Sequence, residues 1–142
     1  MGRGQVSTEL MIIIGAILVI FIPLLVTVYF KTGEANDTME AEQSQHAVSR
    51  LANTINSIGN LGEGAFMRTE VFIPKNAKQI RFYSVGRGGE VTFKIIDGTG
   101  KENDFAEVVK YQLTELTIDN PSQGVATFEI TRKGDMVEIR KL

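Results

Sequence analysis

The chain has 142 residues, no cysteine, one histidine and a formal net charge of −2. Its length allows one globular domain beside a membrane segment, and the absence of cysteine excludes disulfides, thiolate metal sites and cysteine nucleophiles. The single histidine removes most zinc and histidine-triad chemistry, and the small negative charge gives no positive field for nucleic acid. We therefore expect neither an enzyme nor a nucleic-acid-binding protein, and no metal or cofactor.

The first predicted element is an apolar helix. Residues 10–30 form a run of 21 positions without Asp, Glu, Lys, Arg, His, Asn or Gln. As a helix this run would be about 32 Å long, which matches the hydrocarbon core of a bilayer. Arg3 and the α-amino group precede the run and its far side is nearly neutral, so we expect the N-terminus in the cytoplasm and the remaining chain outside.

Three interpretations of this segment are possible, and they differ in how they explain Glu9. A secretory signal peptide would have a shorter apolar run and a small-residue cleavage site after it, which residues 31–34 do not provide. A plain membrane anchor explains the length, but a carboxylate at the edge of the hydrocarbon is destabilising unless it is paired. Cleavage between Gly4 and Gln5 would create an α-amino group about one helical turn from Glu9. In a bundle of such helices, Glu9 of one copy could pair with the amine of the next.

These residues resemble the class III signal peptide of archaeal type IV pilins. In that family a short basic leader ends in glycine, cleavage precedes glutamine, and the pattern Q-x-S-x-E opens the hydrophobic stretch. Gln5, Ser7 and Glu9 match this pattern residue by residue. The resemblance covers residues 1–30, although the glycine that some members carry four residues after the glutamate is Ile13 here.

The resemblance implies a life cycle in two stages. A membrane-embedded aspartyl prepilin peptidase would remove the leader, residues 1–4, and leave a single-pass membrane protein. An assembly machine, with a cytoplasmic ATPase and a platform, would then extract the helix into an extracellular filament on the archaeal cell surface. The expected partners are therefore the membrane, the peptidase, the assembly machinery and further copies of the chain. In this scheme Gly4, Gln5, Ser7 and Glu9 act in processing and assembly, not in catalysis.

The helix is expected to continue beyond the apolar run and to span residues 5–60. Pro23 removes one backbone N–H opposite the carbonyl of Val19, which predicts a kink, although membrane helices also tolerate proline. After residue 41, apolar residues recur at spacings of three and four, which is typical of a helix with one buried face. This stripe comprises Val48, Leu51, Ala52, Ile55 and Ile58, and Ser44, Gln45, Ser49, Arg50, Asn53 and Asn56 are expected to face water or other copies.

Polar groups after the apolar run offer few specific sites. Asn36 begins an N-x-T sequon and is a candidate for N-glycosylation. Carboxylates could bind a cation, but a solvated acidic helix face is the favoured interpretation of the cluster formed by residues 34, 37, 40 and 42. The loop from Asp97 to Asp104 lacks the ligand spacing of an EF-hand and is interpreted as a hairpin connection.

From Arg68 onward the apolar pattern changes to a period of two, which is typical of strands. Turn signals at residues 86–89, 97–100 and 133–135 divide this part into about six strands. Their spacing is typical of an all-β sandwich. We therefore predict an α+β fold shaped like a pilin lollipop, with a long N-terminal hydrophobic helix and a C-terminal antiparallel β-sandwich-like head over residues 65–142.

Two other functions fit the same observations. The chain could be a minor or accessory pilin or an archaellum-associated component, in which case it would be scarce in sheared filaments. It could also be a single-pass membrane-anchored extracellular β-sandwich binding domain, which would stay uncut in the membrane fraction. Cleavage and abundance in filaments distinguish these alternatives from the major filament subunit.

Overall fold

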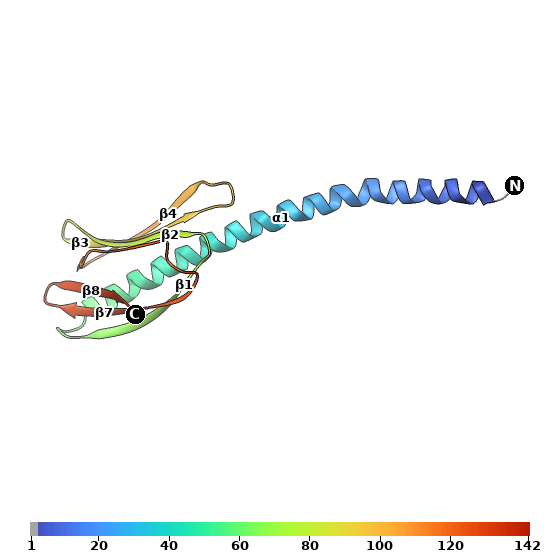
Figure 1. Ribbon diagram of the computed structural model, residues 1–142. Coiled ribbons are helices and arrows are strands. Elements are labelled where there is room, and N and C mark those ends of the chain that lie inside the picture. The colour runs from blue at the N-terminus through green and yellow to red at the C-terminus, as the bar shows by residue number, and fades with distance from the viewer. Residues whose placement is uncertain (1–2) are drawn as a thin grey trace. The chain divides into compact units, whose positions relative to one another are not determined.

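The computed structural model describes residues 3–142, with side chains from Ser7 onward. The chain divides after Asn36 into two units, and each is described by itself. One long helix precedes all the strands (Figure 1). The elements are α1 (Arg3–Gly59), β1 (Phe66–Ile73), β2 (Ala77–Val85), β3 (Gly88–Ile96), β4 (Glu102–Val109), β5 (Gln112–Leu113), β6 (Leu116–Asp119), β7 (Gly124–Lys133) and β8 (Met136–Lys141).

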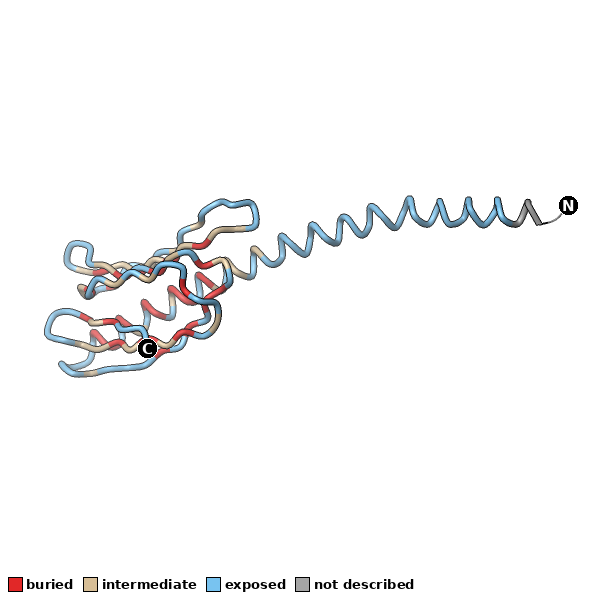
Figure 2. The backbone as a smooth tube through the Cα atoms, in the orientation of Figure 1, coloured by how far each residue is buried: buried red, intermediate tan, exposed pale blue. Residues whose placement is uncertain are grey.

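The first unit is the N-terminal part of α1, and every side chain described in it is exposed (Figure 2). Large apolar side chains share this exposure, with Ile20 at 73% and Tyr29 at 78%. By length and composition this helix is able to cross a membrane. Pro23 lies inside the helix, and its carbonyl accepts a hydrogen bond of 2.8 Å from the hydroxyl of Thr27. The helix is assigned without a break at Pro23, and the kink stays a prediction.

The second unit contains two four-stranded sheets, in the orders β1-β7-β8-β5 and β4-β3-β2-β6. The predicted α+β class, with a long N-terminal helix and a strand-rich C-terminal part, is confirmed. The expected purely antiparallel arrangement is wrong, because β5 runs parallel to β8. The chain leaves one sheet after β4 and returns to it at β6, so β5 is a short excursion to the other sheet. Ser84 of β2 also ties β5 to the sheet that the chain has left, since its hydroxyl donates to the Leu113 carbonyl at 2.9 Å and accepts the Leu113 N–H at 3.0 Å.

The C-terminal half of α1 belongs to the core of this unit. Figure 1 shows this part of the helix running between the two sheets, and its predicted apolar stripe is buried. Ser49 donates to Glu107 of β4 at 3.2 Å, while Ala47 and Arg50 line a small pocket with Val71 and Phe72 of β1. Because β4 and β1 are edge strands of different sheets, the helix fills the space between these two edges. The head is therefore not two sheets packed only on each other.

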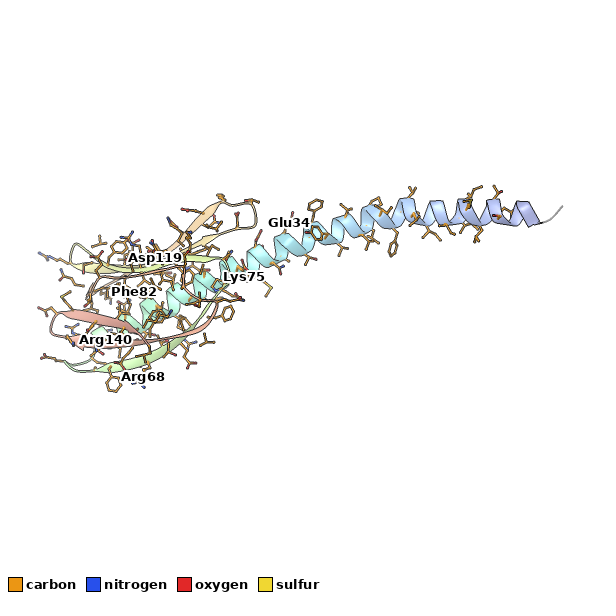
Figure 3. All side chains as sticks on the ribbon, viewed as in Figure 1. Glu34, Arg68, Lys75, Phe82, Asp119 and Arg140 are labelled. Carbon is orange, nitrogen blue, oxygen red and sulfur yellow. The ribbon has the colours of Figure 1, made fainter. Side chains whose placement is uncertain are left out.

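Aromatic side chains fill the region where the sheets approach each other. Phe82 of β2 and Phe128 of β7 come from different sheets, and both are completely buried. Their ring centroids are 5.7 Å apart, in a tilted arrangement that aromatic pairs favour. Phe82 is labelled in Figure 3, where it lies between the two layers of strands. This contact ties the two sheets directly to each other beside the helix.

The end of α1 is fixed by the turn between β4 and β5. Lys110 donates its backbone N–H to the side-chain oxygen of Asn56 at 2.9 Å, and Arg132 donates to the Gly59 carbonyl at 2.8 Å. A Cβ atom on Gly59 would lie 2.1 Å from the ring of Tyr111, so glycine is required for this close approach. These contacts satisfy groups that a helix C-terminus leaves without intrahelical partners.

Two details of the sequence prediction are wrong. About six strands were expected, but the described residues form eight. The chain turns at residues 110–111, since these residues contact the end of α1, and this contact has no signature in the local pattern. Ser44 was expected to face water, yet it is completely buried, and its hydroxyl donates to the Glu40 carbonyl at 2.8 Å.

Candidate functional site

The residues predicted for processing lie on the first turns of α1. Gly4 and Gln5 are helical, and their side chains lie outside the described residues. Ser7 and Glu9 are exposed on the helix, immediately before the apolar run. The proposed pairing of Glu9 with a new α-amino group involves a chain end that exists only after cleavage, so these four assignments stay predictions.

The candidate glycosylation site is accessible. Asn36 is exposed on α1 and lines a shallow pocket of about 280 Å³ with Tyr29, Phe30, Thr32 and Gly33. An exposed amide satisfies the minimum requirement for attachment of a glycan. Occupancy of Asn36 stays a prediction, and glycopeptide mass analysis would measure it directly.

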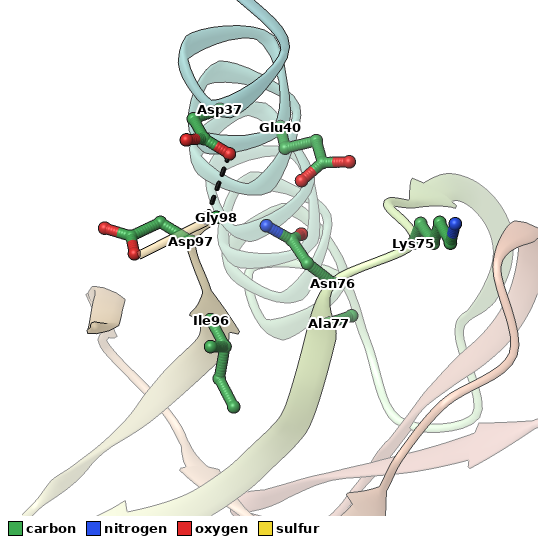
Figure 4. A pocket seen from close by; sticks show the side chains of 8 residues that line it. All are labelled: Asp37, Glu40, Lys75, Asn76, Ala77, Ile96, Asp97 and Gly98. Atoms are coloured by element: carbon green, nitrogen blue, oxygen red, sulfur yellow. Dashed lines mark hydrogen bonds between the residues drawn. The ribbon is translucent and has the colours of Figure 1, made fainter. Parts of the chain in front are cut away.

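The four acidic residues after the apolar run do not form one cluster. Glu34 makes an exposed ion pair of 2.9 Å with Lys31, and Glu42 is exposed. Asp37 and Glu40 are half-buried and turn toward the start of β2 and the end of β3 (Figure 4). The structure therefore separates the expected solvated acidic face into an exposed part and a part that lines a pocket.

This pocket, which we call the acidic pocket, has a volume of about 490 Å³ and lies entirely within the second unit. Volumes of this size are typical of small-ligand sites. The side chain of Asp37 accepts a hydrogen bond of 3.1 Å from the Gly98 N–H, which connects α1 to the loop after β3 (Figure 4). The pocket is lined by Asp37, Glu40, Lys75, Asn76, Ala77, Ile96, Asp97 and Gly98.

Asn76 is the most unusual group in this lining. Both polar atoms of its side chain are buried, and neither has a hydrogen-bond partner among the described residues. A buried amide without partners is destabilising by about 1–3 kcal/mol, so such groups often mark a site of interaction. The backbone of Asn76 is in contrast well held, since its carbonyl accepts the Ile96 N–H at 3.1 Å. The backbone that carries this amide is therefore held at the wall of the acidic pocket.

Asp97 organises the loop between β3 and β4. Its Oδ1 atom accepts the Thr99 hydroxyl at 2.6 Å, the Lys101 N–H at 2.9 Å and the Thr99 N–H at 3.0 Å, and Oδ2 accepts Asn103 at 3.4 Å. The Thr99 hydroxyl, followed by the Lys101 N–H, holds the pKa of Asp97 below its usual value. The predicted interpretation of this segment as a turn is confirmed at residues 97–100, whereas Glu102 already belongs to β4.

We expect Asp97→Asn to lower the melting temperature at neutral pH and to lose this effect in acid. The pKa of Asp97 is lower in the folded state than in the unfolded chain, where it is about 3.9. Its stabilising contribution is therefore complete above about pH 4 and is lost as the pH falls through the folded-state pKa. Thermal unfolding in detergent, followed by circular dichroism from pH 7 to pH 2, measures the difference from wild type.

Glu115→Gln is the control for this experiment, because Glu115 is exposed between β5 and β6. It should unfold like wild type at every pH. A difference between Asp97→Asn and wild type that stays constant down to pH 2 would show that the charge of Asp97 contributes nothing to the loop.

Comparison with known proteins gives no relative for this chain. No protein-family model matches it, and neither a curated protein nor a solved structure does. Within the described part of the chain, no group of three or more His, Asp or Glu side chains is placed to hold a metal ion.

The sequence analysis missed Lys75 and Asn76. They lie in the turn after β1, where Ala77 donates its N–H to the Pro74 carbonyl at 3.2 Å. A Pro-Lys-Asn turn carries no signal for a site. Only the packing of α1 against this turn brings its amide beside two carboxylates.

Proposed function

We propose that this protein is the structural subunit of an archaeal type IV pilus-like filament on the cell surface. Before assembly it is a single-pass membrane protein whose leader is removed between Gly4 and Gln5 by prepilin peptidase. After assembly the apolar helices of many copies form the filament core, and the β-sandwich-like heads cover it. The pilus assembly ATPase and its platform drive the transition from the membrane to the filament.

The exposed apolar surface of α1 carries this proposal. All side chains from residue 10 to residue 30 are exposed, and their removal from water is favourable by about 25 cal/mol for each Å² buried. A bilayer removes them from water before assembly, and a bundle of helices does so afterwards. The bilayer and the bundle can therefore cover the same apolar surface in turn. A filament subunit that begins in the membrane needs a surface of this kind.

Glu9 adds support that a plain anchor does not explain. It is exposed on α1, one residue before the apolar run, where a lone carboxylate gains nothing from lipid. Pairing with the α-amino group of a neighbouring cleaved copy would compensate both charges and would fix the axial register of adjacent helices. Fixing the register of an assembly is the best-attested role of a buried ion pair of this kind.

The proposal is tested by the N-terminus and the location of the native protein. Filaments sheared from the cell surface should contain this chain as an abundant component whose intact mass corresponds to a start at Gln5. A scarce chain with the same start would favour a minor or accessory pilin or an archaellum-associated component. A chain that starts at Met1 or Gly2 and stays in the membrane fraction would overturn the proposal in favour of an anchored binding domain.

A further inference from the structure

The second unit carries unlike charges at the two ends of its β2–β3 hairpin. Asn76 and Asp97 lie at one end, since they flank the paired strand ends Ala77 and Ile95. The turn of Gly86 and Arg87 lies at the other end. Because β3 has nine residues, these ends are roughly 30 Å apart. The same rigid hairpin therefore presents two separate surfaces, one at each end.

The end of the hairpin at the acidic pocket presents carboxylate and amide groups to which a cationic partner can bind. Asp37 and Asp97 each accept hydrogen bonds from the backbone of the loop. The carboxylate of Glu40 makes no hydrogen bond or ion pair within residues 7–142. The buried amide of Asn76 lies between these groups, without a partner for its oxygen or its nitrogen among the described residues (Figure 4). Three carboxylates against the single ammonium of Lys75 leave the pocket negative.

The opposite end presents Arg87 on a turn whose backbone is held in place. Arg87 is exposed at the tip of a two-residue turn and makes no ion pair with any described side chain. The turn is held by Gln112, whose side chain donates to the Gly86 carbonyl at 3.2 Å, and by the left-handed backbone of Gly86 at φ 60°. Of the other cations near this end, Arg132 bonds to Gly59 and Lys133 pairs with Glu138, whereas Lys110 is exposed beside the turn.

We infer that Arg87 of one copy enters the acidic pocket of a second copy and pairs there with Glu40. A guanidinium group suits this site because its planar fork bonds carboxylates in pairs and leaves further N–H groups for the Asn76 oxygen. The contact joins two different surfaces of the chain, and where it repeats head to tail without closing on itself it generates an open assembly. The inference rests on the proposed function, because a filament is an open assembly of this kind.

Cysteine cross-linking tests this contact sharply, because the chain has no native cysteine. Glutamate and arginine side chains that bond through their ends keep their backbones too far apart for a direct disulfide, so a variant carrying both Glu40→Cys and Arg87→Cys is joined with a short bis-maleimide reagent. The two positions lie near opposite ends of a hairpin of roughly 30 Å, beyond the reach of this reagent within one copy, so every bridge between them joins two copies. Treatment of the full chain, in isolated membranes and in sheared filaments, should give a ladder of covalent multimers that is absent without the reagent.

Matched variants define the outcomes. Each single variant should stop at dimers, and Glu42→Cys combined with Arg87→Cys should give no ladder, because Glu42 is exposed on α1 and does not line the pocket. Ladders of equal strength from both double variants would overturn the inference, as would the absence of a ladder from the Glu40 pair in both preparations. If wild type forms no filaments, the proposed function fails, and the membrane preparation alone then decides the contact.

Charge reversal provides a second, independent readout. Arg87→Glu and Glu40→Arg should each reduce self-association of the full chain by about tenfold, since a truncated charge pair leaves the other charge without compensation. The variant with both changes should recover most of this loss. A double variant as weak as the sum of the two single changes would contradict direct pairing of these side chains.

Discussion

The Glu9→Ala variant is expected to be exported and cleaved normally, yet to yield less than about one tenth of the filaments formed by wild type. Removing one partner of a buried ion pair leaves the other charge uncompensated and is destabilising by about 3–5 kcal/mol. In a bundle of helices, the uncompensated group would be the α-amino group of the neighbouring copy. Electron microscopy of sheared material and quantitative immunoblotting of the cell-bound and sheared fractions would measure the yield.

Two further observations complete this test. Glu42→Ala should assemble like wild type, because this exposed residue lies outside the apolar run. Normal filament yield from Glu9→Ala would count heavily against the pairing of Glu9 with the new amine. Accumulation of an uncut chain would instead assign Glu9 to recognition by the peptidase.

Phe128→Ala is expected to be the most damaging single truncation in the head. Phe128 is completely buried on β7, and its ring packs at 5.7 Å from that of Phe82 on the other sheet. Truncation of a buried phenylalanine to alanine is destabilising by about 3–5 kcal/mol, which for a domain of this size lowers the melting temperature by more than about 10 °C. Thermal unfolding in detergent, followed by circular dichroism of the strands, would measure this shift.

Phe66→Ala is the matched control, since Phe66 on β1 is 65% exposed. Its melting temperature should change by no more than a few degrees. A Phe128→Ala variant that melts within the same range would show that the sheets do not depend on this contact, and the helix residues of the core would then have to provide the cohesion.

The long helix could be predicted because its signals are local. The apolar run and the stripe ending at Ile58 both follow the helical period, and the observed end at Gly59 lies within one residue of the predicted end at residue 60. The turn at Gly86 and Arg87 was also visible, because its glycines are local signals as well. In each case the residues that determine the structure are neighbours in the sequence.

The arrangement of the strands depended on contacts between distant residues. β5 pairs with β8 and is tied to β2 by Ser84, and the turn before it is fixed by Asn56 of the helix. Neither interaction leaves a trace in alternation of polar and apolar residues. The acidic pocket was missed for the same reason, since Asp37, Asn76 and Gly98 come from three separated segments. The alternation in the strands indicated which faces are buried, but not what covers them.

The pairing of β1 with β7 sets the order in which the head is completed. β1 is the first strand to be synthesised, yet its neighbour in the sheet follows only after β2 to β6. Pairings between distant segments form slowly, and an edge strand that waits for its neighbour is exposed to strands of other chains. In the proposed membrane precursor, β1 would therefore lie open during an interval in which the helix has already entered the bilayer. Tethering by the helix would hold each immature head at the membrane during that interval, until the last strands, β7 and β8, end the exposure of β1.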